Sequence, residues 1–423
     1  MSKLNLETIL KILNVGENKV KSNDQMDQRC SFASYPDYKK IKYMKEASLQ
    51  FNIQDPFFKL IDARASATCM INGEQFINFS SYNYLNLNGD DRVNEAACEA
   101  IRTYGTSASA SRMVSGERPI HKTLEQMLAQ LHGAQNALAF VSGHATNVTT
   151  IGCMFGPKDL IIHDEYIHNS AIEGIKLSGA TKCAFAHNDW QALDKCLELR
   201  RQQYDRVLVI IEGHYSMDGD YPDLPEFIRV KKRHQAFLMV DEAHSIGVLG
   251  NTGRGICEFF NINGEDVDIW MGTLSKTLAS CGGYIAGSDV LIELLKYSAP
   301  GFIYSTSISP PLAAASCAAL DLMFKEPERI QSLHTRANQF LTEAKQHGLN
   351  TGLSKGVAII PIICGSSRKA VELSNRLFQR KINILPIIYP AVPERQARLR
   401  CFISSAHTKE QISHCVREIS AAI

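Results

Sequence analysis

Five short apolar runs between residues 137 and 272 constrain the fold of this chain more than any other feature of its sequence. Each is five or six residues long, is rich in aliphatic side chains and does not alternate with polar residues: ALAFV (137–141), DLIIH (159–163), RVLVII (206–211), AFLMV (236–240) and DIWMG (268–272). Runs of this kind suit strands that are covered on both faces, as in a parallel sheet flanked by helices. The sequence therefore predicts an α/β fold with a mostly parallel sheet.

The rest of the chain divides around this α/β region. Apolar residues at helical spacing between residues 4 and 13 predict a short helix, and residues 121–133 predict another that ends at a glycine. After Pro310 a helical region extends to about residue 347, and the tail then alternates short strands and helices. We expect an N-terminal extension (1–50), an N-terminal segment contributing to the active site (51–95), a large domain (96–330) and a smaller C-terminal α+β domain (331–423).

Charge and cysteine usage argue against several classes of protein. The 45 Lys and Arg residues nearly balance the 44 Asp and Glu residues, whereas a nucleic-acid binder usually has a large basic excess. No apolar run approaches the ~20 residues that span a membrane, and the first residues lack an apolar signal stretch. Twelve cysteines are scattered without a CxxC pair, which favours reduced thiols over disulfides or zinc ligands. We therefore expect a cytoplasmic enzyme without a metal site, a membrane span or a nucleic-acid partner.

Two polar clusters follow strands that we expect to lie in one sheet. The run AFLMV leads into Asp241 and His244, and the run DIWMG leads into Thr273 and Lys276. Taken alone, such an aspartate is more often a helix cap and such a lysine is more often solvated. Ligands of open parallel sheets bind at the carboxyl ends of the strands, so the two clusters together favour a shared site. An aspartate beside a lysine suits pyridoxal phosphate, which forms a Schiff base with lysine and needs a carboxylate at its ring nitrogen.

A pyridoxal phosphate site also requires a place for the phosphate. The run ALAFV is followed by the small residues SGHATN (142–147), which open a predicted helix. A helix N-terminus offers free amide N–H groups and the positive end of the helix dipole to an anion. An ordinary strand-to-helix turn would have the same sequence character. The glycine-rich stretch 250–255 matches neither common nucleotide-binding spacing, so a nucleotide loop is a weak alternative.

Six segments, in order along the chain, resemble signatures of the α-oxoamine synthases: NFSSYNYLNL (78–87), HDEYIHNSAIEGIKLSGA (163–180), IIEGHYSMDGDYPDL (210–224), VDEAHSIGVLGNTGRG (240–255), GTLSKTLASCGGYIAG (272–287) and PAVPERQARLRCFISSAHT (390–408). The resemblance covers roughly residues 50–423. The sequence of these segments is most similar to the versions found in enzymes associated with polyketide and fatty-acyl assembly lines. The resemblance implies the fold of fold-type-I pyridoxal phosphate enzymes and a decarboxylative condensation of a small amino acid with an acyl thioester to an α-amino ketone.

The resemblance also implies roles around the cofactor ring. Lys276 matches the Schiff-base lysine, which also moves the Cα proton of the substrate, and Asp241 matches the partner of the ring nitrogen. His168 matches the histidine that stacks on the ring. His244 and Ser216 match residues that reach the phenolic oxygen or support each other there. Lys276, His168, Asp241 and His244 are therefore the expected catalytic residues, and Ser216 is an expected cofactor contact.

Other residues match the family positions that hold the phosphate. Gly143 and His144 would supply backbone amides, and Thr273 would supply its hydroxyl. Ser305 and Thr306 match a phosphate contact that the family takes from the neighbouring subunit. The resemblance therefore implies a homodimer with shared active sites.

The amino acid substrate needs a partner for its carboxylate. Arg400 matches the family's carboxylate-binding arginine, whose fork suits the anion. Asn83 matches an asparagine that helps to hold the same carboxylate. For Arg398, two residues before Arg400, we expect a side chain that diverges from Arg400 and forms a surface or interdomain ion pair.

Several alternatives stay open at this point. Lys276, Asp241 and Arg400 would serve an aminotransferase or an aldol-type lyase equally well, and a non-catalytic partner subunit is a third hypothesis. Glycine, alanine and serine are all candidate amino donors, and the acyl group could arrive on coenzyme A or on an acyl-carrier protein. Carrier proteins are acidic, so a basic patch between Lys39 and Lys45 offers an electrostatic match, although a solvated basic turn explains it as well.

Overall fold

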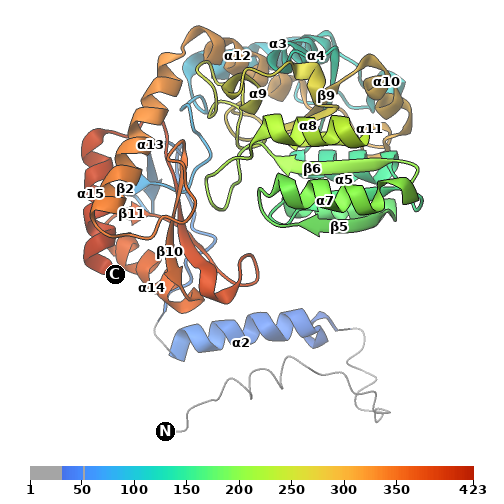
Figure 1. Cartoon of the computed structure of the whole chain (residues 1–423). Coiled ribbons are helices and arrows are strands. Elements are labelled where there is room, and N and C mark those ends of the chain that lie inside the picture. The colour runs from blue at the N-terminus through green and yellow to red at the C-terminus, as the bar shows by residue number, and fades with distance from the viewer. Residues whose placement is uncertain (1–30, 51–52) are drawn as a thin grey trace. The chain divides into compact units, whose positions relative to one another are not determined.

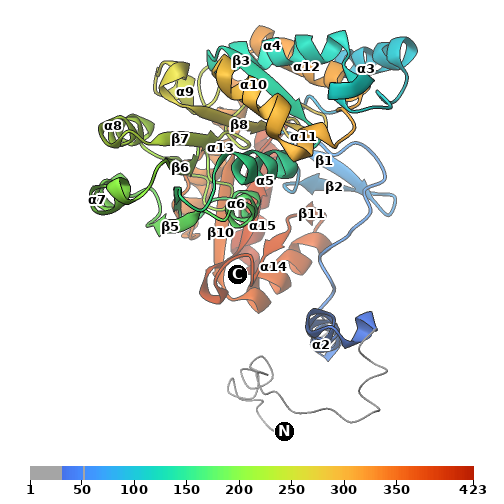
Figure 2. The same ribbon diagram turned by 90° about the vertical axis from the view of Figure 1, so that its right-hand side faces the viewer.

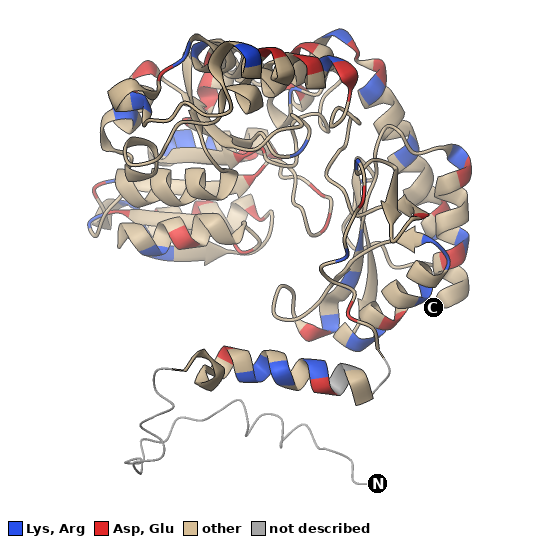
Figure 3. Cartoon of the chain, turned by 180° about the vertical axis from the view of Figure 1, so that it is seen from behind, with Lys and Arg blue, Asp and Glu red and all other residues tan. Residues whose placement is uncertain are grey.

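The computed structural model describes residues 31–50 and 53–423, which divide into two units at Asp55. In the first unit a 3₁₀ turn, Phe32–Ser34, precedes helix α2, Pro36–Gln50. The basic patch lies on α2, where acidic residues are interspersed with the lysines (Figure 3) and two lysine–carboxylate ion pairs form along the helix. The short helix predicted between residues 4 and 13 lies outside the described residues.

The second unit, Pro56–Ile423, contains a seven-stranded sheet with the order β3-β9-β8-β7-β6-β4-β5 (Figure 1). Strands β4 to β8 are parallel to one another, and β9 is antiparallel to both of its neighbours. The strands are β3 (Asn136–Phe140), β4 (Leu160–Asp164), β5 (Thr181–Phe185), β6 (Val207–Glu212), β7 (Phe237–Asp241), β8 (Ile269–Thr273) and β9 (Gly283–Gly287). The mostly parallel sheet and the five predicted strands are confirmed, each to within one residue.

Sequence reasoning missed two strands of this sheet, for different physical reasons. Strand β5 is an edge strand whose first four residues are partly or fully exposed, so it lacks the apolar run that marks its neighbours. Strand β9 is fully buried, but it has glycine at both ends and lies inside the segment interpreted as the lysine motif. Composition alone therefore identified the five apolar strands, but it missed the exposed edge strand β5 and the antiparallel strand β9.

Helices cover both faces of the sheet (Figure 2), and alternate residues of every strand except β5 pack into separate cores on the two faces. In β6, for example, Val209 and Ile211 belong to one core, and Leu208 and Ile210 belong to the other. The first core is covered by α4 (Pro119–His132), α7 (Trp190–Arg200), α8 (Leu224–His234) and α12 (Pro310–Lys325), and the second by α5 (Gly143–Met154), α6 (Asn169–Ser178), α10 (Asp289–Ser298) and α11 (Pro300–Ile303). Coverage on both faces explains why these strands show no polar alternation.

Helix α4 confirms the helix predicted at 121–133, although it begins two residues earlier. Pro119 is its first residue, where a missing N–H costs nothing. Gly133 follows its last residue in the left-handed conformation, with φ 63°, which glycine adopts without steric penalty. Helices α3 (Asp91–Tyr104) and α9 (Ile256–Phe259) complete the larger part of this unit.

The C-terminal part contains two small three-stranded sheets. Strands β10 (Ile359–Gly365), β13 (Ala397–Phe402) and β12 (Pro386–Ile387) form one of them, in that order. The other joins the hairpin β1 (Thr68–Ile71) and β2 (Glu74–Asn78) to β11 (Ile382–Asn383). Helices α13 (Glu328–Gln346), α14 (Ser367–Gln379) and α15 (Lys409–Ala422) complete this part, whose α+β character was predicted. The pairing of an N-terminal hairpin with a C-terminal strand was not predicted.

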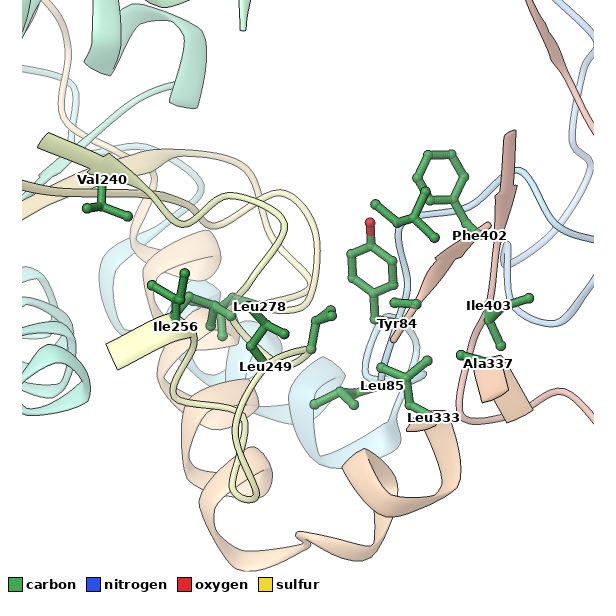
Figure 4. Close-up of a cluster of buried hydrophobic side chains, with 14 of the residues drawn as sticks. Tyr84, Leu85, Val240, Leu249, Ile256, Leu278, Leu333, Ala337, Phe402 and Ile403 are labelled. Carbon is green, nitrogen blue, oxygen red and sulfur yellow. The ribbon is translucent and has the colours of Figure 1, made fainter. Parts of the chain in front are cut away.

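A continuous buried core joins the large and small parts of this unit (Figure 4). Leu333 of α13 and Ile403, which follows β13, lie near Tyr84 and Leu85, and Leu249 comes from the larger part. Each of these side chains is fully buried, which stabilises the fold by roughly 1.5–3 kcal/mol for a large apolar side chain. The segment around residues 79–87 is therefore held in place between the two parts. No described helix is both long enough and apolar enough to cross a membrane.

Candidate active site

A cavity of about 360 Å³ lies at the carboxyl ends of β6, β7 and β8, the place expected for a ligand of this sheet. Residues from the helices α5 and α6, from the segment before Tyr84 and from β13 complete its lining. It brings together nine of the predicted site residues: Gly143, His144, His168, Ser216, Asp241, His244, Thr273, Lys276 and Arg400. Residues far apart in sequence thus meet at one site.

Asp241 is the last residue of β7, and its carboxylate is buried and held on both oxygens. One oxygen accepts a hydrogen bond from the backbone N–H of Ala243 at 3.0 Å, and the other accepts from Asn147 Nδ2 at 2.9 Å. Asn147 also donates to Ser170 Oγ at 2.9 Å, while its own side-chain oxygen is buried without a partner among the described residues. The carboxylate is therefore oriented before any ligand arrives. Asn147 and Ser170 were not predicted as site residues, although Asn147 lies one helical turn after Gly143.

Lys276 lies in the loop after β8 and reaches the same cavity. Burial lowers the pKa of its amine to about 8, against the opposing influence of the carboxylates of Asp241 and Glu212. Its Nζ lies 5.6 Å from the centre of the Tyr82 ring. A lysine with this pKa is partly neutral near physiological pH, and the neutral amine is the nucleophilic form.

Glu212 is a second buried carboxyl group in the cavity, and sequence reasoning assigned it no role. It ends β6 and is the register partner of Asp241 across the parallel pair. Burial and then the neighbouring charge of Asp241 raise its pKa well above the usual range, although the charge of Lys276 opposes this. The backbone of His168 also acts in the opposite direction and lowers this pKa. Ionisation of Glu212 is therefore disfavoured in this cavity.

His168 precedes α6 and caps its N-terminus. Its Nδ1 accepts the backbone N–H of Ser170 at 3.2 Å and lies 2.7 Å from the Ser170 hydroxyl. A ring nitrogen that accepts a hydrogen bond carries no proton, so the imidazole is neutral. Burial lowers the pKa of His168, in agreement with this assignment. The ring borders the cavity with its orientation fixed from the helix end.

His244 is fixed from the opposite side. Its Nδ1 lies 2.7 Å from the hydroxyl of Tyr84, whose ring belongs to the core between the two parts of the unit (Figure 4). Burial and then the positive charge of Lys276 hold the pKa of His244 well below its usual range. His244 is therefore a neutral hydrogen-bonding group in the cavity.

The N-terminus of α5 forms one end of the cavity. The Ser142 side chain caps this helix by accepting the N–H of Ala145, and the first amides of a helix have no partner within it. A Cβ on Gly143 would lie 2.9 Å from Thr273 Oγ1, so only glycine allows this close approach. Thr273 itself donates to the carbonyl of Gly282 at 3.0 Å while lining the cavity. The arrangement offers an anion free amides and the helix dipole.

Arg400 enters the cavity from β13. Its Nη1 donates to the carbonyl of Ser216 at 3.2 Å, and its Nη2 lies 3.4 Å from the hydroxyl of Tyr82. Its Nε is buried and has no hydrogen-bond partner among the described residues. A half-buried guanidinium with an unused donor has free capacity for an anion. Tyr82 and Met217, which also line the cavity, were not predicted.

The predicted divergence of Arg398 from Arg400 is wrong. Residues two apart in a strand share a face, and both side chains reach the same loop: Arg400 contacts Ser216, and Arg398 donates to the carbonyl of Met217 and to Asp218. The predicted ion pair of Arg398 is present, with 2.7 Å between its Nη1 and Asp218 Oδ1, and both partners are buried.

Three predicted site residues lie outside this cavity. The Asn83 amide is bonded within its own segment, to the carbonyls of Ala65 and Asn88, and Asn83 lines a neighbouring hollow instead. Ser305 and Thr306 line a third, separate hollow. The substrate and phosphate roles of these three residues stay predictions. Within the described residues, no group of histidine, cysteine and carboxylate side chains is arranged to hold a metal ion.

Comparison with known proteins identifies relatives of the whole α/β unit. The family model described as aminotransferase class I and II matches residues 74–419. An 8-amino-7-oxononanoate synthase of Treponema denticola is 38% identical over 379 residues, which are 90% of this chain and 94% of the relative. A serine palmitoyltransferase of Bacteroides thetaiotaomicron is 36% identical over 368 residues, 87% of this chain and 92% of the relative.

Solved structures give the same result for the fold. A high-resolution structure of SPT with PLP internal aldimine superimposes with a TM-score of 0.88 at 28% identity, covering 93% of this chain and 98% of the solved one. The seven-stranded mixed sheet and the smaller C-terminal part therefore have the arrangement of a known pyridoxal phosphate enzyme.

Proposed function

Because the chain belongs to the class I and II aminotransferase family and, within it, to the α-oxoamine synthases, we propose that its cavity condenses a small amino acid with an acyl thioester. The chain is a pyridoxal-phosphate-dependent acyltransferase, and its products are an α-amino ketone, CO2 and a free thiol. The observation that carries the assignment to this cavity is the meeting of Lys276, Asp241 and Arg400 around one space.

The residues present fit the cofactor. Lys276 would hold its aldehyde carbon, Asp241 would face its ring nitrogen, and the N-terminus of α5 at Gly143 would hold its phosphate. The unpartnered side-chain oxygen of Asn147 shows that the buried polar network around Asp241 has remaining bonding capacity. When bound, pyridoxal phosphate supplies an electron sink for negative charge at the Cα of the substrate. Asp241, hydrogen-bonded on both oxygens, would accept a hydrogen bond from the ring nitrogen and so favour its protonated form.

The amino acid is held by its carboxylate. Arg400 offers a guanidinium already fixed by Ser216 and Tyr82, with its Nε unused. A volume of about 360 Å³ is near the lower end of small-molecule sites, about 300–1,000 Å³, so a bound cofactor leaves room for only a small side chain. Glycine, alanine and serine therefore remain the candidate donors.

Lys276 also moves the proton at Cα. Its lowered pKa, about 8, gives the amine a proton affinity near the working pH, which is the condition for efficient general acid–base catalysis. His168 and His244 are neutral and are hydrogen-bonded to the hydroxyls of Ser170 and Tyr84, respectively. They therefore orient the reactants without competing for the proton. A bond from Cα to the acyl carbon would form as the thiol leaves; the carboxylate held by Arg400 would then leave as CO2, and Lys276 would return a proton to Cα to complete the amino ketone.

The acyl donor is an acyl-CoA or an acyl-carrier protein. Tyr82 and Lys276 line both the cofactor cavity and the neighbouring hollow that Asn83 borders, so a second reactant has access to Lys276 from that side. Both donor types carry the reacting thioester on the same kind of flexible arm. Assays with each donor in parallel, measuring thiol release, identify the one that is used.

We also propose a homodimer with shared sites, which the positions of Ser305 and Thr306 support. Both lie outside the cavity of their own chain, and Tyr304 beside them is 86% exposed. In the proposed dimer, Ser305 and Thr306 reach the phosphate bound by the partner subunit. We further propose that the enzyme works in the cytoplasm. Mixing the Lys276→Ala variant with a Ser305→Ala/Thr306→Ala variant tests this: sharing predicts restored activity, because one site of each mixed dimer is complete. Residues acting within one chain would leave the mixture inactive.

The function itself is tested by titrating the purified protein separately with glycine, alanine and serine while recording the visible absorption of the bound cofactor. We expect one amino acid to change the spectrum and to support thiol and CO2 release with an acyl thioester. A keto acid formed without thioester would indicate an aminotransferase instead. A protein that binds no pyridoxal phosphate would contradict the enzymatic assignment.

A further inference from the structure

The loop of residues 213–220 forms one side of the cavity and is hydrogen-bonded to the C-terminal part of the chain. Ser216 accepts a hydrogen bond from Arg400, and Met217 and Asp218 are bonded to Arg398. A Cβ on Gly219 would lie 2.0 Å from the carbonyl of Ile359, which shows how closely the loop follows β10. The position of Arg400 therefore depends on the position of this loop.

The other side of the loop is attached to the large sheet through His187. Its Nδ1 lies 2.9 Å from Asp164 Oδ1, at the end of β4, and its Nε2 lies 2.9 Å from Asp220 Oδ2, at the end of the loop. All three side chains are at most 8% exposed. Carboxylates only accept hydrogen bonds, so both ring nitrogens must donate and His187 is a buried cation between two anions.

The surroundings of His187 keep this attachment rigid. Asp164 also accepts the backbone N–H groups of Tyr166 and Asn188 at 2.8 and 2.7 Å. The rings of Tyr166 and Tyr215 pack against the imidazole, with centroids 4.6 and 4.5 Å away. Burial opposes the charge, but the two carboxylates outweigh it and raise the pKa of His187 to about 10. His187 lies outside the cavity lining, and its bond to Asp220 connects it to the loop that forms one side of the cavity.

We propose that His187 is a positioning residue for the substrate carboxylate: through Asp220 it fixes the 213–220 loop, and the loop in turn fixes the guanidinium of Arg400. The inference rests on the proposed function, because it assumes that Arg400 binds the carboxylate of the amino acid. Without the bond to His187, the Asp220 side chain keeps only the bond from Asn188 Nδ2 at 2.8 Å, so this end of the loop is held less firmly. A less fixed Arg400 binds its anion more weakly, because the cost of ordering it then falls on the binding step.

Asp220→Ala is the most direct test, since it cuts the attachment to the loop and leaves the His187–Asp164 pair intact. Amino acid binding is measured on the holoenzyme through the absorption of the bound cofactor, with glycine, alanine and serine and with the amines that lack their carboxylate: methylamine, ethylamine and ethanolamine. We expect the amino acid to bind about tenfold more weakly. The matching amine, which does not use Arg400, should bind as in the unmodified enzyme.

A second variant and a matched control separate positioning from stability. His187→Gln keeps a hydrogen-bond donor but no charge and should give the same selective loss. Asp220→Asn keeps an acceptor for His187 and should restore much of the affinity. Arg206→Ala breaks another ion pair with a buried carboxylate, that of Asp159, far from the cavity, and should leave both affinities unchanged.

The outcomes distinguish this inference from the function on which it rests. If the unmodified enzyme responds to no amino acid, the proposed function fails. If it does respond, and Asp220→Ala weakens the amino acid and the amine equally or weakens neither, the positioning role of His187 is overturned.

Discussion

The two walls of the cavity are built differently. The large-domain wall, Asp241, Thr273 and Lys276, follows directly from buried strands, and its carboxylate is bonded through Asn147 to helix α5. The small-domain wall is Arg400 on β13, held by a backbone carbonyl of a loop and by a tyrosine hydroxyl. Strand ends in a covered sheet move little, whereas a loop depends on its attachments. We propose that the first wall holds the cofactor and that the second recognises the substrate.

The largest effect is expected in the large-domain wall. Lys276→Ala removes both the group that holds the cofactor aldehyde and the group that moves the Cα proton. Turnover, measured as thiol release, should fall by about ten-thousand-fold or more, since proton transfer alone contributes up to about that factor. Circular dichroism should remain unchanged. Activity within tenfold of the unmodified enzyme would mean that another residue is the base.

In the small-domain wall, Arg400→Lys should affect binding more than chemistry. Lysine keeps the charge but loses the planar fork, so we expect KM for the amino acid to rise about tenfold to a hundredfold. The retention of pyridoxal phosphate should not change. Arg398→Lys is the matched control on the same face, and its KM should rise less because Arg398 does not line the cavity. Loss of cofactor from Arg400→Lys would mean that the small-domain wall also holds the cofactor, which would contradict the proposed difference between the walls.

The attachment of the loop should appear in the pH dependence of stability. The pKa of His187 is about 10 in the folded chain against 6.5 for an ordinary histidine. The stabilisation from its charge is therefore complete below pH 6.5 and is lost as the pH rises through 10. Denaturant midpoints of the unmodified protein and His187→Gln should converge over this interval. A constant difference between the two proteins would show that His187 is not charged.

The smallest expected effect is the change in the pKa of Lys276, in the large-domain wall, when Arg400 in the small-domain wall is substituted. In cofactor-free protein, the rate at which pyridoxal phosphate adds to Lys276 should rise with pH, with a midpoint about 8, because only the neutral amine reacts. The positive charge of Arg400 lowers this pKa only weakly, so Arg400→Gln should move the midpoint slightly upward. A midpoint near 10.5 would mean that Lys276 is not desolvated.

The same contrast explains what the sequence could predict. The cofactor wall was predictable because apolar runs mark the strands and the carboxyl ends of parallel strands meet, which places Asp241 near Lys276. Arg400 came from the resemblance to a family. Nothing local in the sequence marks Asn147, Glu212 or Tyr82, because their roles depend on neighbours that only the fold supplies.

His187 illustrates this limit most clearly. A histidine after an exposed edge strand has no distinctive sequence pattern, and its two carboxylate partners come from β4 and from the end of the 213–220 loop. The divergence expected of Arg398 failed for a simpler reason, since the two-residue period of a strand puts both arginines on one face.

The most direct test of the two-wall account compares Asp241→Asn with Arg400→Gln in the same pair of measurements, pyridoxal phosphate retention after dialysis and amino acid binding at saturating cofactor. We expect Asp241→Asn to lose its cofactor. We expect Arg400→Gln to keep its cofactor but to lose most of its affinity for the amino acid. If Arg400→Gln releases the cofactor as readily as Asp241→Asn, or binds the amino acid normally, separate roles for the two walls in cofactor binding and substrate recognition are contradicted.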